Sequence, residues 1–171
     1  MCFIFAFQGN LPLASFCIFA GAFFDFFDGL AARLLEVSGE LGKQLDSMAD
    51  MVTFGVAPGM ILFQLIYYSQ TISFFQSNIT DPNLFPAILA FLLPLFAAIR
   101  LAKFNIDTRQ TTSFIGLPTP ALAIFVASLP LIAEYQQLSM LSDFRLLIAI
   151  AVILPLLLVV KIPLFSLKFS K

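Results

Sequence analysis

Charged residues and histidine are scarce in this sequence. Lys, Arg, Asp and Glu together make up 11% of its 171 residues, histidine does not occur, and 60% of the residues are hydrophobic. Soluble globular proteins carry about a quarter charged residues, so the composition predicts an integral membrane protein. The formal net charge of −1 leaves no basic stripe to neutralise phosphates, which argues against a nucleic acid as partner.

Cysteines, a leader sequence and repeats are likewise rare or missing. Cys2 and Cys17 lie in apolar segments, which favours buried small side chains over a disulfide or a metal site. Residues 1–7 are apolar but far shorter than the ~20 residues of a spanning helix, and no basic region precedes them, so they do not predict a signal peptide. We interpret them as the end of a first helix whose beginning is missing. No repeat or linker divides the chain, which predicts one N-terminally incomplete domain over residues 1–171.

Apolar runs define the expected fold. They predict full membrane spans at residues 11–27, 45–68, 84–104, 115–135 and 144–165. The fold class expected is therefore all-α, a polytopic transmembrane helix bundle with five full spans plus the remnant of a sixth at the N-terminus. Within it, residues 54–59 (FGVAPG) predict a loosened or bent helix, although a membrane helix also tolerates proline without a functional bend.

Aspartates interrupt the apolar pattern on both sides of a predicted turn. Asp25 and Asp28 are spaced i, i+3, and Asp46 and Asp50 are spaced i, i+4, so each pair shares one helix face. Residues 37–39 predict the turn of a helical hairpin. Measured from that turn, Asp28 and Asp46 lie roughly 15 and 12 Å along their helices, and Asp25 and Asp50 about 20 and 18 Å. The two pairs therefore come level with each other.

Acids that face one another in this way need a counter-charge. Oxygen ligands without histidine or cysteine suit hard divalent cations such as Mg²⁺, Mn²⁺ or Ca²⁺. The alternative is that the carboxylates pair with Arg33 and Lys43 or reach water. Because the heights match and only these two bases lie nearby, we predict a metal site.

The same residues carry a family resemblance. The pattern D-G-x2-A-R-x8-G-x3-D-x3-D is matched by Asp28, Gly29, Ala32, Arg33, Gly42, Asp46 and Asp50. This sequence thereby resembles the CDP-alcohol phosphatidyltransferases, and Asp25 matches an additional upstream aspartate common in that family. The resemblance implies that Asp25, Asp28 and Asp46 bind metal, that Asp50 both binds metal and acts as general base, and that two ions, Mg²⁺ or Mn²⁺, are held. It also implies a homodimer.

Small residues in the motif suggest where a CDP-lipid binds. Gly29 and Gly42 would let the nucleotide approach the helix backbones, and Ala32 keeps the same face narrow. Arg33 can reach a phosphate through a charge-assisted fork. The alternatives are close helix packing for the glycines and an ordinary interfacial position for the arginine.

Two further blocks narrow the acceptor alcohol. Residues 45–59 and 100–120 resemble the phosphatidylserine synthase branch of the family. This implies transfer of the phosphatidyl group from CDP-diacylglycerol to L-serine, giving phosphatidylserine and CMP. Basic and amide side chains in the second block are candidates for binding serine or phosphate: Arg100, Lys103, Asn105 and Arg109. The alternative for these residues is contact with anionic lipid headgroups at a helix end.

Lysine and arginine predict the orientation. Most of them fall in the aspartate hairpin, between the spans at 84–104 and 115–135, and at the C-terminus, whereas Arg145 falls on the other side. By the positive-inside rule the aspartates face the cytoplasm, and we expect the bacterial inner membrane, with membrane lipids as neighbours. The competing functions are a sister transferase using glycerol phosphate, inositol phosphate or another alcohol, and an ion-coupled transporter, whose site would lie near the midplane.

Overall fold

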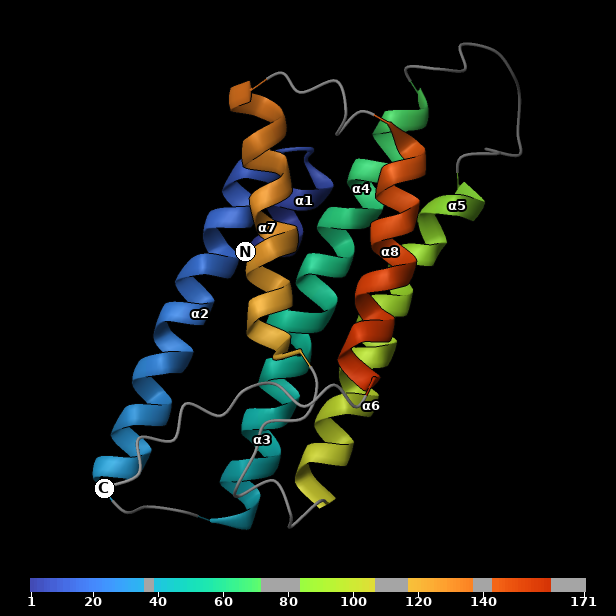
Figure 1. The fold of residues 1–171 in the computed structure, drawn as a ribbon. Coiled ribbons are helices and arrows are strands. Elements are labelled where there is room, and N and C mark those ends of the chain that lie inside the picture. Colours follow the sequence, from blue (N-terminus) through green and yellow to red (C-terminus); the bar gives the residue numbers. More distant parts are fainter. Residues whose placement is uncertain (36–38, 72–83, 107–116, 137–142, 161–171) are drawn as a thin grey trace, which may run out of the picture.

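The computed structural model describes residues 1–35, 39–71, 84–106, 117–136 and 143–160. Within these ranges every regular element is helical, which confirms the predicted all-α membrane bundle (Figure 1). The elements in chain order are α1 (Cys2–Phe7), α2 (Leu11–Leu34), α3 (Glu40–Asp50), the π-helix η1 (Met51–Val56), α4 (Ala57–Thr71), α5 (Leu84–Ile88), the 3₁₀-helix η2 (Leu89–Phe91), α6 (Leu92–Ile106), α7 (Thr119–Gln136) and α8 (Phe144–Val159).

Local sequence explains where α2 begins. Gly9 has a φ of +78°, a left-handed conformation that glycine adopts without strain, and it turns the chain between α1 and α2. The side chain of Asn10 then caps α2 by accepting a hydrogen bond from the Leu13 amide at 3.3 Å. Pro12 lies in the first turn, where no backbone donor is needed. The helix continues without a break, so Asp25 lies on the same rod as the apolar run that precedes it.

A second rod joins α3, η1 and α4 into one continuous helix from Glu40 to Ser69. The loosening predicted over residues 54–59 lies three residues earlier, as η1, which begins at Met51 directly after Asp50, whereas residues 57–59 belong to the α-helix α4. A π-helical turn is wider than an α-helical one and occurs frequently at functional sites. Phe54 is buried in this segment. Helix α3, which carries Asp46 and Asp50, is therefore continuous with a segment that is packed inside the bundle.

Two glycines bring this rod close to α6. A Cβ atom on Gly55 would lie 3.1 Å from Cβ of Ala97, and one on Gly59 would lie 3.0 Å from Cδ of Pro94. Small residues at a membrane helix interface let the backbones approach and gain van der Waals contact. The separation between the rod and α6 is therefore set at these two positions.

Apolar clusters on both sides of the central rod hold the bundle together. One joins α4 to α6, α7 and α8 and includes Leu62 and Ile66, whereas the other joins the rod to α1, α2 and α7 and includes Phe54 and Ile61. Figure 1 shows α2 beside α7 and α6 beside α8, with α4 between these pairs. The central helix is thus the one that α3 extends towards one end of the bundle.

Within the part of the chain that the structure describes, three helices are long and apolar enough to cross a membrane: Leu11–Ala32, Glu40–Ser69 and Pro86–Asn105. The apolar helices Thr119–Tyr135 and Phe144–Val159 are shorter over the described residues, and the predicted spans at 115–135 and 144–165 extend beyond them. Helix α1 occupies the residues predicted as the remnant of a first helix.

The outward-facing surface of the bundle is apolar. Phe16, Phe24, Leu95 and Ile153 each expose more than half of their surface, at 55%, 65%, 55% and 55%. Large contiguous apolar surfaces of this kind mark contact with a membrane or another protein, and the lengths of the helices favour the membrane.

Candidate metal and substrate site

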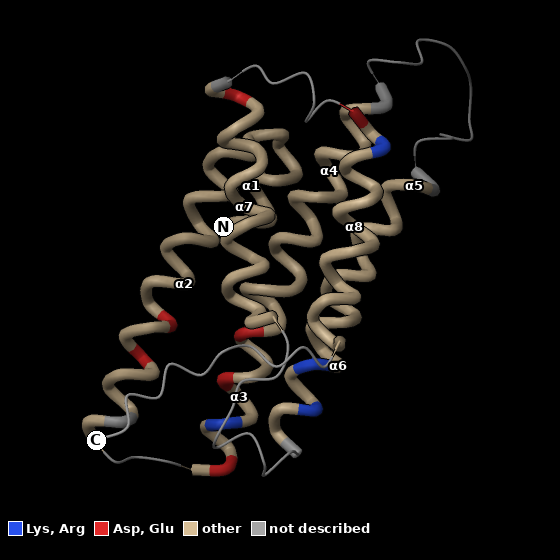
Figure 2. Tube along the Cα trace, in the orientation of Figure 1, with Lys and Arg blue, Asp and Glu red and all other residues tan. Residues whose placement is uncertain are grey.

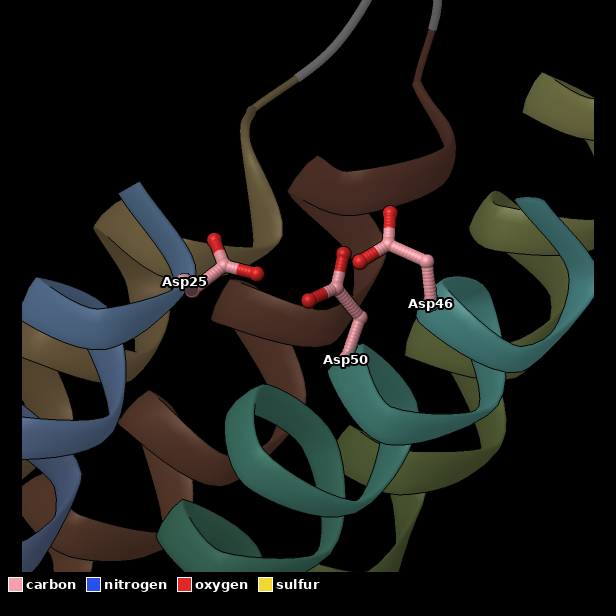
Figure 3. A group of neighbouring side chains, drawn as sticks. All are labelled: Asp25, Asp46 and Asp50. Atoms are coloured by element: carbon pink, nitrogen blue, oxygen red, sulfur yellow. The ribbon is translucent and has the colours of Figure 1, made fainter. Parts of the chain in front are cut away.

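Three of the four predicted aspartates come together where α2 and α3 approach each other. Asp25 projects from α2, and Asp46 and Asp50 project from adjacent turns of α3 (Figure 3). One carboxylate oxygen of each residue lies within 4.8 Å of one oxygen of each of the others. The i, i+4 spacing puts Asp46 and Asp50 on one face of α3, and the tertiary packing turns that face towards Asp25.

Burial differs among the three acids. The side chains of Asp25 and Asp50 are partly buried, whereas Asp46 is exposed. Asp28 is exposed as well and is not a member of this group, although it acts electrostatically on Asp25 from one turn farther along α2. The acids therefore form a site that is covered on one side and open on the other.

The donor set of this group fits a divalent cation. Carboxylate oxygens are the ligands that Mg²⁺, Mn²⁺ and Ca²⁺ prefer. Arg100 acts electrostatically on Asp50, and a divalent ion bound by these oxygens would supply further positive charge. The residues present therefore fit the metal predicted from the sequence.

Basic residues gather at the same end of the bundle as the acids. Figure 2 shows Lys and Arg on α3 and at the end of α6 next to the acidic segments, and Arg145 of α8 belongs to the opposite end. On α6 these residues are Arg100 and Lys103. Arg109 lies outside the described residues, and of Arg33 the structure describes only the backbone, in the last turn of α2. The charge asymmetry used to predict orientation is therefore present in the fold.

Arg100 is the basic side chain most closely associated with the acids. It is partly buried, its Nη1 donates a hydrogen bond to Oγ1 of Thr119 at 3.3 Å, and it acts electrostatically on Asp50. Its Nε atom is buried and has no hydrogen-bond partner among the described residues. Buried polar atoms are seldom left unpaired in proteins, so this donor is suited to a ligand oxygen. The buried Thr119, at the start of α7, was not identified from the sequence, because nothing local links it to Arg100.

Asn105 forms hydrogen bonds with side chains of α3. Its Nδ2 donates to Oγ of Ser47 at 2.9 Å and to Oε1 of Gln44 at 3.4 Å. Sequence reasoning proposed Asn105 as a binder of serine or phosphate and did not single out Ser47 or Gln44. These two residues lie far from Asn105 in the chain, so no spacing pattern predicts the contact.

The glycines of the motif lie in open surroundings. A Cβ atom added to Gly29 or Gly42 would have no described neighbour within 4 Å, in contrast to Gly55 and Gly59 on the central rod. Close helix packing among the described residues therefore does not explain the two motif glycines. Ala32 is exposed on α2, so none of the described residues packs closely against this face at the two glycines.

Comparison with known proteins places these features in a family. Residues 1–162 match the family model for CDP-alcohol phosphatidyltransferase. The chain is 40% identical over 111 residues to CDP-diacylglycerol–serine O-phosphatidyltransferase of Bacillus subtilis, covering 65% of this chain and 56% of that protein. It is 35% identical over 128 residues to the protein of the same name from Helicobacter pylori strain J99, covering 74% and 49%.

An archaeal relative extends the comparison. Archaetidylserine synthase of Methanothermobacter thermautotrophicus is 32% identical over 135 residues, which cover 77% of this chain and 52% of that protein. The chain spans about half the length of the curated relatives it matches. The names of these relatives agree on serine, while they differ in the lipid.

Proposed function

Since the chain belongs to the CDP-alcohol phosphatidyltransferase family, a family of membrane enzymes that depend on divalent metal ions, we propose that it transfers a phosphatidyl group from CDP-diacylglycerol to the hydroxyl of L-serine. The products are phosphatidylserine and CMP. The observation that carries this proposal is the meeting of Asp25, Asp46 and Asp50 within 4.8 Å, at the end of the bundle that also bears Arg100. The names of the relatives support serine as the acceptor.

Each aspartate has a proposed role. Asp25, Asp28 and Asp46 hold the metal, Mg²⁺ or Mn²⁺ in two ions, and Asp50 holds metal and serves as general base. Divalent ions held by these carboxylates would supply positive charge that stabilises the diphosphate and the departing phosphate. The serine hydroxyl oxygen attacks the phosphorus of the phosphatidyl group, and the bond from this phosphorus to CMP breaks. Asp50 accepts the proton that the serine hydroxyl loses in this step. Partial burial of Asp50 restricts the access of water to this carboxylate.

The CDP-lipid is proposed to lie along the motif face of α2 and α3. The open space around Gly29 and Gly42 supports close approach of the nucleotide to both helices, beside the exposed Ala32. Arg33, one turn after Gly29 on α2, is the proposed partner of a phosphate. A bulky residue at either glycine would occupy the volume that the nucleotide requires.

The serine carboxylate or the lipid phosphate is proposed to meet the basic residues that follow on α6. Arg100 is the leading candidate, because its Nε has no hydrogen-bond partner among the described residues and its charge acts on Asp50. Lys103, Asn105 and Arg109 are the further candidates from the sequence. A guanidinium binds a carboxylate in a bidentate fork that neither a lysine nor an amide can form.

Cellular placement is part of the same proposal. The enzyme is proposed to be a homodimer in the bacterial inner membrane, with the acids facing the cytoplasm. The basic residues at the acidic end of the bundle support this orientation through the positive-inside rule. Soluble serine and CMP would then enter and leave on the side where they occur.

A direct assay tests the function. Detergent-purified protein is given labelled CDP-diacylglycerol and Mn²⁺ with serine, glycerol phosphate or inositol phosphate, and CMP release is measured. We expect release with serine, and a loss of about 10²-fold or more in Asp50→Asn, as for removal of a general base, with the helical circular dichroism unchanged. Release with another alcohol but not with serine would assign the chain to a sister transferase. Undiminished turnover in Asp50→Asn would remove Asp50 from the role of base.

A further inference from the structure

Helix α3 carries two of the three clustered acids, yet apolar packing does not hold it. Among its eleven residues, Glu40–Asp50, none is buried. Its direction is anchored at the η1 end, where Phe54 and Gly55 are buried. Asp50 adjoins that anchor, whereas Asp46 lies one turn farther out, about 6 Å along the axis. A small change in the direction of α3 would therefore move the carboxylate of Asp46 more than that of Asp50.

Polar contacts restrain α3 from the side of α6. Ser47, the residue after Asp46, accepts a hydrogen bond from Nδ2 of Asn105 at 2.9 Å, and its own hydroxyl can donate to the Lys43 carbonyl at 3.0 Å or to Oδ1 of Asn105 at 3.2 Å. The second amide hydrogen of Asn105 is directed to Gln44 at 3.4 Å. Asn105 thus contacts two successive turns of α3, on both sides of the position at which Asp46 leaves the helix.

We propose that Asn105 is a positioning residue: through Ser47 and Gln44 it fixes α3 against α6 and so holds the carboxylate of Asp46 next to Asp25. This inference rests on the proposed metal role of the aspartates. It assigns Asn105 to the assembly of the metal site, not to direct contact with serine. Asn105 lies in the last turn of α6, a helix fixed by the close approach of Gly55 and Gly59, so the side chain projects from a rigid support.

The two roles of Asn105 predict different measurements. Loss of a neutral hydrogen bond changes a free energy by about 0.5 to 1.5 kcal/mol, which corresponds to roughly a two- to tenfold change in an equilibrium constant. A positioning role therefore predicts that Asn105→Ala and Ser47→Ala raise the Kd for Mn²⁺ two- to tenfold while the KM for serine at saturating Mn²⁺ stays within twofold. A serine-binding role predicts a raised KM for serine, an unchanged Kd for Mn²⁺ and no effect of Ser47→Ala.

The experiment uses the full chain in detergent. Mn²⁺ binding is followed by electron paramagnetic resonance of the free ion, and amide hydrogen exchange of α3 is followed in the metal-free protein. Ser47→Thr, which keeps the hydroxyl, should restore the Mn²⁺ affinity. Ser128→Ala is the matched control, because Ser128 donates to a carbonyl of its own helix at 2.6 Å, as Ser47 does, and forms no hydrogen bond to another helix among the described residues.

Hydrogen exchange tests the contact between Asn105 and α3 separately from the metal role of Asp46. We expect the amides of α3 to exchange several-fold faster in Asn105→Ala and Ser47→Ala than in wild type or Ser128→Ala. Unchanged exchange together with an unchanged Kd for Mn²⁺ would overturn the positioning role. Asp46→Asn tests the underlying site: if Mn²⁺ binds this variant as tightly as wild type, the metal role of Asp46 fails, while faster exchange in the Asn105 variant would still identify the contact with α3.

Discussion

Replacing Asp25 by asparagine should stabilise the metal-free protein while weakening its response to metal. Three carboxylates lie within 4.8 Å of one another. At that separation two unit charges repel by about 3.5 kcal/mol at an effective dielectric constant of about 20, and by about 0.9 kcal/mol in bulk water. Asp25 is the position to change because Arg100 acts on Asp50 and offsets part of its repulsion. Since Asp46 is exposed, the lower figure applies to the Asp25–Asp46 pair, and removing this repulsion in Asp25→Asn should raise the free energy of unfolding by about 1 kcal/mol.

The assay is thermal unfolding in detergent, followed by circular dichroism, because the chain has no tryptophan. A gain of about 1 kcal/mol corresponds to a rise in Tm of about 2 to 4 °C for a chain of this size. With EDTA present, Asp25→Asn should melt above wild type by this amount. With Mn²⁺ present the order should reverse, because an ion that binds the folded state stabilises it by mass action, and the variant has lost a ligand.

Asp143→Asn is the matched control. Asp143 caps α8 and accepts a hydrogen bond from the Arg145 amide at 3.0 Å, and asparagine caps a helix about as well. This change removes one negative charge at the opposite end of the bundle and should leave the Tm nearly unchanged in both conditions. Two results would refute the reasoning: a Tm of Asp25→Asn in EDTA no higher than that of Asp143→Asn, or an equal rise with Mn²⁺ in variant and wild type.

Further predictions concern glycines and Arg100. Gly59→Val should lower the Tm by several degrees, at a cost of about 1 to 3 kcal/mol for overpacking, because its Cβ would lie 3.0 Å from the Pro94 ring. Gly42→Val, in open space, should leave the Tm unchanged and raise the KM for CDP-diacylglycerol; a wild-type KM would argue against a nucleotide at this face. Arg100 is proposed to bind the anionic group of one substrate, and Arg100→Lys should raise the KM of that substrate about tenfold or more. The reason is that hydrogen bonds to charged groups contribute about 1.5 to 3 kcal/mol. Unchanged KM values for both serine and CDP-diacylglycerol would remove Arg100 from the site.

Local sequence information is enough to predict the fold class and the family. Composition is enough to predict a membrane protein, because a chain with so few charged residues cannot present a polar surface to water. Helical periodicity is local, so the i, i+4 spacing of Asp46 and Asp50 places them on one face before any packing is known. The D-G-x2-A-R pattern starting at Asp28 predicts the family that the comparison then supports. Local composition also predicts a loosened helix near residue 54, although the π-helical form and its start at Met51 do not follow from it.

Which side chains meet depends on how the helices pack against one another, and this is not encoded in local spacing. The packing brings Asp25, Asp46 and Asp50 together and leaves Asp28 outside the group, a distinction that depends on how α2 rotates against α3. It pairs Asn105 with Ser47, which is 58 residues away, and Arg100 with Thr119. The physical reason is that spacing fixes positions along one helix, whereas the rotation and separation of neighbouring helices come from close contacts such as that of Gly59, whose partners lie elsewhere in the chain.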